Sequence, residues 1–252
     1  MSEKKTNQDM NIQGHLSELR TRLTWSLVIF ILCFGGCFYY SEDIYSFLVK
    51  PLAMIYENQS GKRLIYTGLT EAFFTYMKVA FYAGLFVSFP FIAAQCYIFV
   101  APGLYKNEKK ILLPFLIATP VLFFAGGALV YYVIFPLAWK FFVSFETLGG
   151  QGDLPIMLEA KVSEYLSLVI NLILAFGIAF QMPILLTLLA RVGLITSDML
   201  VKNRRYSIVI ILLVAAFLTP PDIMSQIGLA LPMMLLYEIS IFSCRMVAKQ
   251  RK

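Results

Sequence analysis

The sequence predicts an all-α integral membrane protein with six transmembrane helices in a kinked, concave bundle and both termini on the cytoplasmic side. The first observation is composition: 59% of the 252 residues are hydrophobic, only 14% are charged, and the mean hydropathy is +0.75. A soluble domain carries about 45 to 50% apolar and about 25% charged residues. Long charge-free intervals and an uneven distribution of basic residues are the other two observations.

Six intervals are expected to cross the membrane, so that 1–252 forms a single transmembrane domain. About 20 helical residues cross a hydrocarbon core of about 30 Å. Asp222, beside Pro220 and Pro221, divides the last apolar region into two short helices joined by a tight turn. One kinked helix over that region would be too long for a single span. The expected crossings are 23–41, 79–105, 111–139, 165–190, 206–221 and 223–244.

The distribution of Lys and Arg predicts the orientation. An even number of crossings divides the remaining segments into two sets, and the set that contains both termini holds 15 of the 21 basic residues. The other set, with the loops 42–78 and 140–164, holds 6 basic residues and 9 of the 15 acids. Because cytoplasmic loops are enriched in Lys and Arg, we expect both termini in the cytoplasm and these two loops outside.

Proline is expected to shape the bundle. In the first outer loop, Ile44, Phe47, Leu48 and Ile55 predict an amphipathic segment that is broken by Pro51 and caps the outer face. Prolines within or at the ends of the crossings predict kinked or curved helices. These prolines are Pro90, Pro102, Pro114, Pro120, Pro136, Pro183 and Pro232.

Composition also argues against several classes of function. The only histidine, His15, stands outside the apolar runs, and the four cysteines show no metal-binding spacing, so we expect no enzyme, no cofactor and no metal. The net charge of +6 is interpreted as loop charge that fixes orientation, not as a nucleic-acid surface. The alternative function is a small-solute secondary transporter, which would normally have repeated halves around a midplane site, and no convincing internal repeat is present.

Two acids are candidates for a binding role on the cytoplasmic side. Glu18 precedes the first crossing and lies four residues before Arg22, a spacing that on its own favours a simple helical ion pair. Glu108 is the only acid of the short loop 106–110. Two carboxylates on one surface could instead hold a pair of guanidinium groups through bidentate hydrogen bonds.

Polar residues within the predicted crossings form a second group of candidates. Gln181 precedes Pro183 in the fourth crossing, while Thr219 and Gln226 flank Asp222 in the last hairpin. Such side chains either bond to a neighbouring helix of the same chain or form a docking point for another transmembrane helix. Asp222 lies at the turn, and exposure of the turn to water is the simpler explanation for a charged residue within this apolar region.

Several strings, in order along the chain, resemble one family. These strings are HLSELRTRL, FVAPGLYKNEKK, AFGIAFQMPI, and LTPPD with the SQ that follows. Together they resemble TatC, the multi-spanning receptor subunit of the twin-arginine protein translocase, from about residue 15 to the last crossing. The resemblance implies a glove-like bundle of six helices with cytoplasmic termini and two short final helices.

The resemblance also implies roles for individual residues. Glu18 and Glu108 match the cytoplasmic carboxylates with which the family recognises the twin arginines of a signal peptide. Phe99 matches an aromatic residue of the same surface, and Arg20 matches a basic position that is expected to orient Glu18. Pro51 matches a functionally sensitive proline of the first outer loop.

Partners and location follow from the same resemblance. Many members of the family have Glu where this chain has Gln181, whereas Thr219 and Gln226 match a polar patch that contacts the single-span partners TatB and TatA. The implied function is to bind signal peptides of folded cargo, to self-associate in a receptor complex and to support export driven by the proton motive force. The chain shows no evident N-terminal transit segment, so we expect a bacterial inner membrane.

Overall fold

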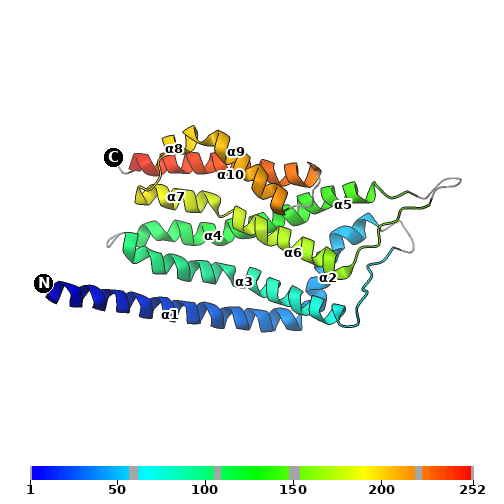
Figure 1. Ribbon diagram of the computed structural model, residues 1–252, viewed down its shortest axis with the longest axis horizontal. Coiled ribbons are helices and arrows are strands. Elements are labelled where there is room, and N and C mark those ends of the chain that lie inside the picture. Colours follow the sequence, from blue (N-terminus) through cyan, green and yellow to red (C-terminus); the bar gives the residue numbers. More distant parts are fainter. Residues whose placement is uncertain (1, 57–61, 105–108, 148–153, 219–222, 251–252) are drawn as a thin grey trace.

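Helices make up almost all of the described structure, which is a computed structural model covering residues 2–56, 62–104, 109–147, 154–218 and 223–250. Most of the helices run side by side along the long axis of the molecule (Figure 1). The elements are α1 (Ser2–Tyr39), α2 (Ser41–Ile55), α3 (Glu71–Leu104), α4 (Lys109–Leu129), η1 (Val130–Ile134), α5 (Phe135–Val143), α6 (Val162–Ala179), α7 (Met182–Val192), α8 (Ser197–Lys202), α9 (Arg204–Leu218) and α10 (Ile223–Gln250).

The bundle has six membrane spans. In the described ranges, five helical segments are long and apolar enough to cross a membrane on their own: Leu16–Tyr39, Glu71–Phe99, Pro114–Val143, Val162–Val192 and Gln226–Val247. The remaining span is α9, the fifth in chain order, which has only 15 residues and is thus one of the two short final helices that the sequence predicted. At a rise of 1.5 Å per residue, α9 is about 22 Å long, less than the usual thickness of the hydrocarbon core.

The last helix is longer than the charge-free interval suggested. The charge-free run 223–237 ends before Glu238, but α10 continues through Glu238 to Gln250 and has 28 residues, so it exceeds the expected crossing 223–244 and is not short. Glu238 does not interrupt the helix because its carboxylate accepts a hydrogen bond from Arg204 Nη2 at 2.7 Å and remains about half exposed. A charge at the end of a span is tolerated when it is paired and reaches water.

The predicted break of the amphipathic segment at Pro51 is wrong, because α2 runs through this residue to Ile55. A proline inside a helix normally leaves the carbonyl four residues earlier without its amide partner. Here that carbonyl belongs to Phe47, and it accepts a hydrogen bond from the Tyr131 hydroxyl. The helix keeps Leu48, Pro51 and Leu52 buried against the rest of the bundle.

Two of the seven prolines lie at interruptions of the helices, whereas α3, α4 and α10 continue as α-helices through Pro90, Pro102, Pro114, Pro120 and Pro232. The π-turn η1 lies directly before Pro136, whose missing N–H leaves the Tyr132 carbonyl without its helical partner. The predicted crossing 165–190 consists of two helices, α6 and α7, which meet at Gln181 just before Pro183. These interruptions give the bundle its curved shape (Figure 1).

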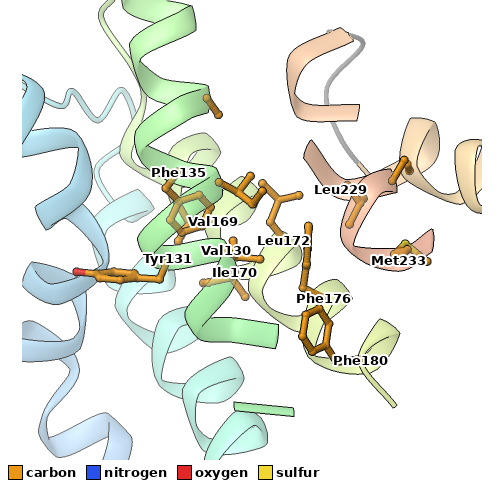
Figure 2. Packing of buried hydrophobic residues seen from close by; sticks show 14 of the residues in the cluster. Val130, Tyr131, Phe135, Val169, Ile170, Leu172, Phe176, Phe180, Leu229 and Met233 are labelled. Carbon is orange, nitrogen blue, oxygen red and sulfur yellow. The ribbon is translucent and has the colours of Figure 1, made fainter. Parts of the chain in front are cut away.

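The core lies where η1, α5, α6 and α10 meet (Figure 2). Fully buried residues from these elements include Val130, Phe135, Val169, Phe176 and Leu229. Glycine allows α4 to approach α6 closely, because a Cβ atom at Gly126 would lie only 2.7 Å from the carbonyl oxygen of Phe176. This glycine therefore serves packing inside the chain.

The two ends of the bundle differ in charge. The N-terminus, the C-terminal end of α10, helix α8, the end of α3 and the beginning of α4 lie at one end, while α2 lies at the other (Figure 1). We call the first of these the basic end, because the segments assigned to it hold 15 of the 21 Lys and Arg residues. The fold therefore brings together the segments that the charge distribution had grouped.

Candidate functional site

An ion pair on α1 is the main feature of the basic end. Arg22 Nη2 and Nε donate hydrogen bonds to Glu18 Oε1 at 2.6 and 3.0 Å. The Glu18 side chain is 34% exposed and that of Arg22 is 23% exposed. Both bonds end on the same oxygen, and within the described residues Glu18 Oε2 accepts no hydrogen bond. The carboxylate therefore keeps one oxygen available for a second donor.

The ion pair is attached to the neighbouring helix through Gln95. Arg22 Nη1 donates a hydrogen bond to Gln95 Oε1 at 3.2 Å, which joins α1 to α3. Phe99 lies one helical turn further along α3 and is half-buried. The structure thus brings Glu18, Arg22, Gln95 and Phe99 to the same pair of helices. Gln95 was missed in the sequence, although it is the only amide side chain within the charge-free interval 79–105.

The expectation that Arg20 orients Glu18 is wrong for this structure, in which Arg22 makes the contact. Residues four apart on a helix face each other, whereas residues two apart point to different sides. The side chain of Arg20 is exposed. Its expected part in peptide binding stays a prediction.

Three predicted site residues, Glu108, Thr219 and Asp222, lie outside the described residues. Glu108 directly precedes Lys109, where α4 begins. Thr219 and Asp222 fall between Leu218, where α9 ends, and Ile223, where α10 begins. The roles predicted for these three residues stay predictions.

Gln181 belongs to a buried polar cluster at the break between α6 and α7. Its Nε2 atom donates to the carbonyl oxygens of Thr119, at 3.1 Å, and Gly177, at 3.4 Å, and the residue is only 6% exposed. The hydroxyl of Thr119 in turn donates to Tyr97 on α3 at 3.2 Å. The amide oxygen of Gln181 is buried without a hydrogen-bond partner. The cluster connects α3, α4 and the α6–α7 break.

Gln226 lies elsewhere, at the start of α10. Its Nε2 atom donates to the carbonyl oxygen of Leu212 at 3.3 Å and so joins α10 to α9. In the described part of the chain, no hydrogen bond links Gln226 to Gln181. The structure therefore does not bring these two predicted contact residues into one cluster.

Glu146 joins the segment between α2 and α3 to the segment between α5 and α6. Its Oε1 atom accepts hydrogen bonds from Lys62 Nζ at 2.6 Å, from the Tyr56 hydroxyl at 3.2 Å and from the Leu158 amide at 3.0 Å. The hydrogen bond from Lys62 is the main cause that lowers the pKa of Glu146. Burial, followed by the adjacent Glu146 charge, raises the pKa of Tyr56 to about 12. The sequence did not predict this contact, because Lys62 and Tyr56 precede Glu146 by 84 and 90 residues.

The chemistry of these groups is that of binding. Among the residues described above, no three His, Cys, Asp or Glu side chains gather as metal ligands, and all four cysteines are free thiols. Glu18 offers a charge and a free acceptor oxygen, and the other clusters offer hydrogen bonds between helices. Such groups can recognise a cation or another helix.

Comparison with known proteins identifies one family. The family model described as Sec-independent protein translocase protein (TatC) matches residues 14–232. The TatC protein of Rickettsia prowazekii (strain Madrid E) is 46% identical over 241 residues, covering 96% of this chain and 95% of the relative. The TatC protein of Magnetococcus marinus is 49% identical over 237 residues, covering 94% of this chain and 84% of the relative.

A solved structure agrees with these sequence matches. A crystal structure of the twin-arginine translocase receptor TatC is similar to this chain with a TM-score of 0.77 and 35% sequence identity, covering 93% of this chain and 99% of that one. A second crystal structure of the same receptor, in DDM, also gives a TM-score of 0.77, with 36% identity. On these grounds the chain belongs to the TatC family of Sec-independent protein translocase components.

Proposed function

We propose that this chain is the receptor core of the twin-arginine translocase and binds the signal peptides of folded cargo proteins at its basic end. The observation that carries this proposal is the half-exposed Glu18 carboxylate with one acceptor oxygen free. A planar guanidinium can donate two N–H groups to a carboxylate, whereas the ammonium group of lysine cannot match that geometry. Because the two peptides carry the same charge, the site distinguishes Arg-Arg from Lys-Lys by the geometry of the donors.

The electrostatics of the basic end favour the same proposal. The segments assigned to this end hold 15 basic residues and 6 acids, so an arginine-rich peptide is repelled by most of the surface. A carboxylate attracts the peptide locally on this otherwise repulsive surface, so the position of Glu18 determines where the arginines bind. Glu108, the acid of the α3–α4 connection, is proposed as the second carboxylate for the second arginine.

Arg22 and Gln95 hold the carboxylate in a fixed orientation. Arg22 occupies Glu18 Oε1 and is itself held from α3 by Gln95, so that Oε2 is left for the peptide. Phe99, on the same face of α3 as Gln95, is proposed to contact the apolar part of the peptide next to its arginines. Arg20 is exposed and is proposed to contact polar peptide groups. An internal pair of this kind preorganises the site before the peptide arrives.

We further propose that the chain lies in a bacterial inner membrane with both termini in the cytoplasm and the segments 42–78 and 140–164 outside. The basic end then faces the cytoplasm, in accordance with the enrichment of Lys and Arg in cytoplasmic loops. The membrane crossings are proposed near the ranges expected from the sequence, with α9 as the short fifth crossing. Cargo carrying a signal peptide would then meet the receptor from the side on which it is synthesised.

Single-span subunits of the TatA and TatB type are the proposed partners, together with further copies of this chain. The α9–α10 hairpin is the proposed contact region, because Thr219, Asp222 and Gln226 lie in or beside its turn and α9 exposes a largely apolar surface. Gln181 is buried and is proposed to act through the position of the α6–α7 break. Pro51 is proposed to act through the shape of α2. Export by the assembled complex is proposed to use the proton motive force.

Site-specific photocrosslinking in native membranes tests the proposal. A photoreactive residue replaces Ser17, which is exposed next to Glu18 and leaves the carboxylate intact, and a control probe replaces the exposed Met199 at the same end. The expected result is a crosslink from position 17 to an Arg-Arg signal peptide that is largely lost with Lys-Lys and is weak from position 199. Equal crosslinking of both peptides from both positions would contradict the proposal.

A further inference from the structure

A cavity of about 380 Å³ lies between α3, α4, η1 and α6 and is bounded by α2. We call it the α3–α6 groove. Its walls are almost entirely apolar and include Val79, Phe86, Gly127, Tyr131, Ile170 and Leu174. It is only partly enclosed, so an acyl chain can enter it. An apolar cavity of this kind does not retain water.

The length of the groove corresponds to one leaflet of a bilayer. Along α3 the lining residues run from Val79 to Val87, and eight residues of helix span about 12 Å. Half of a hydrocarbon core of about 30 Å is about 15 Å. An extended acyl chain lying along α3 and α6 would therefore occupy the groove over most of its length.

The positively charged side chain of Lys78 lies beside one end of this groove. Lys78 directly precedes Val79, and its Nζ atom donates a 2.8 Å hydrogen bond to the hydroxyl of Ser167 on α6. Ser167 lies one turn before Ile170, so the two walls of the groove meet at this hydrogen bond. Lys78 is exposed and forms no ion pair with any residue of the described ranges. An ammonium group has three donors, and the side chain therefore has capacity for an anion.

We infer that the α3–α6 groove is a phospholipid site, in which one acyl chain fills the apolar groove and the phosphate group pairs with Lys78. The apolar walls select a hydrocarbon chain, and the unpaired cation at the edge selects an anionic headgroup. The site is separate from Glu18, and the inference goes beyond peptide recognition.

The bound lipid has a structural consequence for α1 and α2. The most apolar stretch of the α1 span has no buried residue. Cys37 of α1 nevertheless lines the groove, as do Ile44 and Phe47 of α2. A lipid chain in the groove would contact all of these residues and also Ile170 on α6. The lipid would therefore add to the direct contact that Phe47 of α2 already makes with Tyr131 of η1.

Photoreactive lipids test the site. The full-length protein is placed in nanodiscs with a trace of phosphatidylglycerol that carries a diazirine on one acyl chain, and the adducts are mapped by mass spectrometry after irradiation. We expect adducts concentrated on the peptides that contain 79–87 and 170–174. Lys78→Gln should reduce them about fivefold, while Lys140→Gln, which removes an exposed lysine of α5, should not.

Two further comparisons separate the headgroup from the chain. A diacylglycerol probe, which lacks the phosphate, should label the groove weakly and with no dependence on Lys78. Ala128→Phe, at a lining residue, should block labelling of the groove, whereas Ala216→Phe on the exposed face of α9 should leave it unchanged. Crosslinking of the signal peptide from position 17 should persist in Lys78→Gln.

Adducts spread evenly over all lipid-facing helices would overturn the inference, as would groove adducts that are unaffected by both Lys78→Gln and Ala128→Phe. The inference would also fail if the groove were labelled by a signal peptide or a partner helix and never by the lipid probe in nanodiscs that contain all of them.

Discussion

The hydroxyl of Tyr131, in the π-turn η1, donates a 2.8 Å hydrogen bond to the backbone carbonyl of Phe47 on α2. Pro51 lies four residues after Phe47 and has no N–H, so the hydroxyl supplies the donor that the helix lacks. The rings of Tyr131 and Phe47 also stack, with centroids 4.3 Å apart. Figure 2 shows Tyr131 pointing away from the other core residues toward α2. The proline and the tyrosine thus form one structural unit.

Removing this hydroxyl should destabilise the protein. Tyr131→Phe leaves the Phe47 carbonyl without a donor, and the expected cost is about 1 to 3 kcal/mol in the free energy of unfolding. In a Pro51→Ala background the restored backbone N–H can serve the same carbonyl, so the cost of Tyr131→Phe should fall. Denaturant unfolding in detergent measures the free energy of unfolding of wild type, Tyr131→Phe, Pro51→Ala and the double variant. Tyr132→Phe, which alters an exposed neighbour, is the control, and equal costs in both backgrounds would refute the coupling.

Replacing Gln95 should weaken recognition of the signal peptide. Gln95→Leu removes the acceptor that holds Arg22 on α3, so the Glu18–Arg22 pair loses its fixed position. The loss of one hydrogen bond of about 1 kcal/mol corresponds to an affinity about fivefold lower for an Arg-Arg peptide. Peptide binding in nanodiscs measures this effect, with Cys96→Ala at the exposed neighbouring position as control. Identical affinities of the two variants would show that Gln95 does not position the site.

Gln181 should tolerate leucine better than alanine. Gln181→Leu loses the hydrogen bonds of Nε2 but also removes an amide oxygen that is buried without a partner. Gln181→Ala loses the same bonds and leaves a cavity, at an additional cost of about 2 kcal/mol. Thermal unfolding in detergent compares the two variants. If alanine were the better tolerated of the two, the packing described for the α6–α7 break would be incorrect.

The contact of Glu146 should make the segments that it joins sensitive to acid. Because Lys62 lowers the pKa of Glu146 in the folded protein, the contact contributes its full stability above the unfolded carboxyl pKa of about 4.3. This contribution is lost as the pH falls from that value through the lower folded pKa. Wild type should therefore be more stable than Glu146→Gln at pH 7, and the difference should shrink below about pH 4.

Unfolding midpoints between pH 3 and pH 7 measure this difference. Glu159→Gln, which changes an exposed acid of the same loop, is the control and should match wild type throughout. A difference between wild type and Glu146→Gln that grows toward acid pH would contradict the assigned contact.

Properties that depend on short stretches of sequence were predictable. The six-span helical bundle, the interruptions beside Pro136 and Pro183 and the grouping of basic segments followed from charge-free intervals, breaker residues and charge. The contact between Arg22 and Gln95 was not predictable, because it depends on how α1 crosses α3. The continuity of α2 through Pro51 likewise depends on Tyr131, which lies 80 residues further along the chain. The family strings located Glu18 and the four-residue spacing predicted its ion pair with Arg22, but only the structure identified Gln95 as the residue that joins this pair to α3.

The most direct test of the central claim is the affinity of a fluorescent signal peptide for the protein in lipid nanodiscs. Wild type, Glu18→Gln and Asp198→Asn are compared with Arg-Arg and Lys-Lys peptides; Asp198 is an exposed acid of α8 at the same end of the molecule. We predict that Glu18→Gln weakens Arg-Arg binding about 10- to 100-fold, to the level of Lys-Lys, and that Asp198→Asn has no effect. Unchanged Arg-Arg binding by folded Glu18→Gln would contradict the assignment of Glu18 as the twin-arginine site.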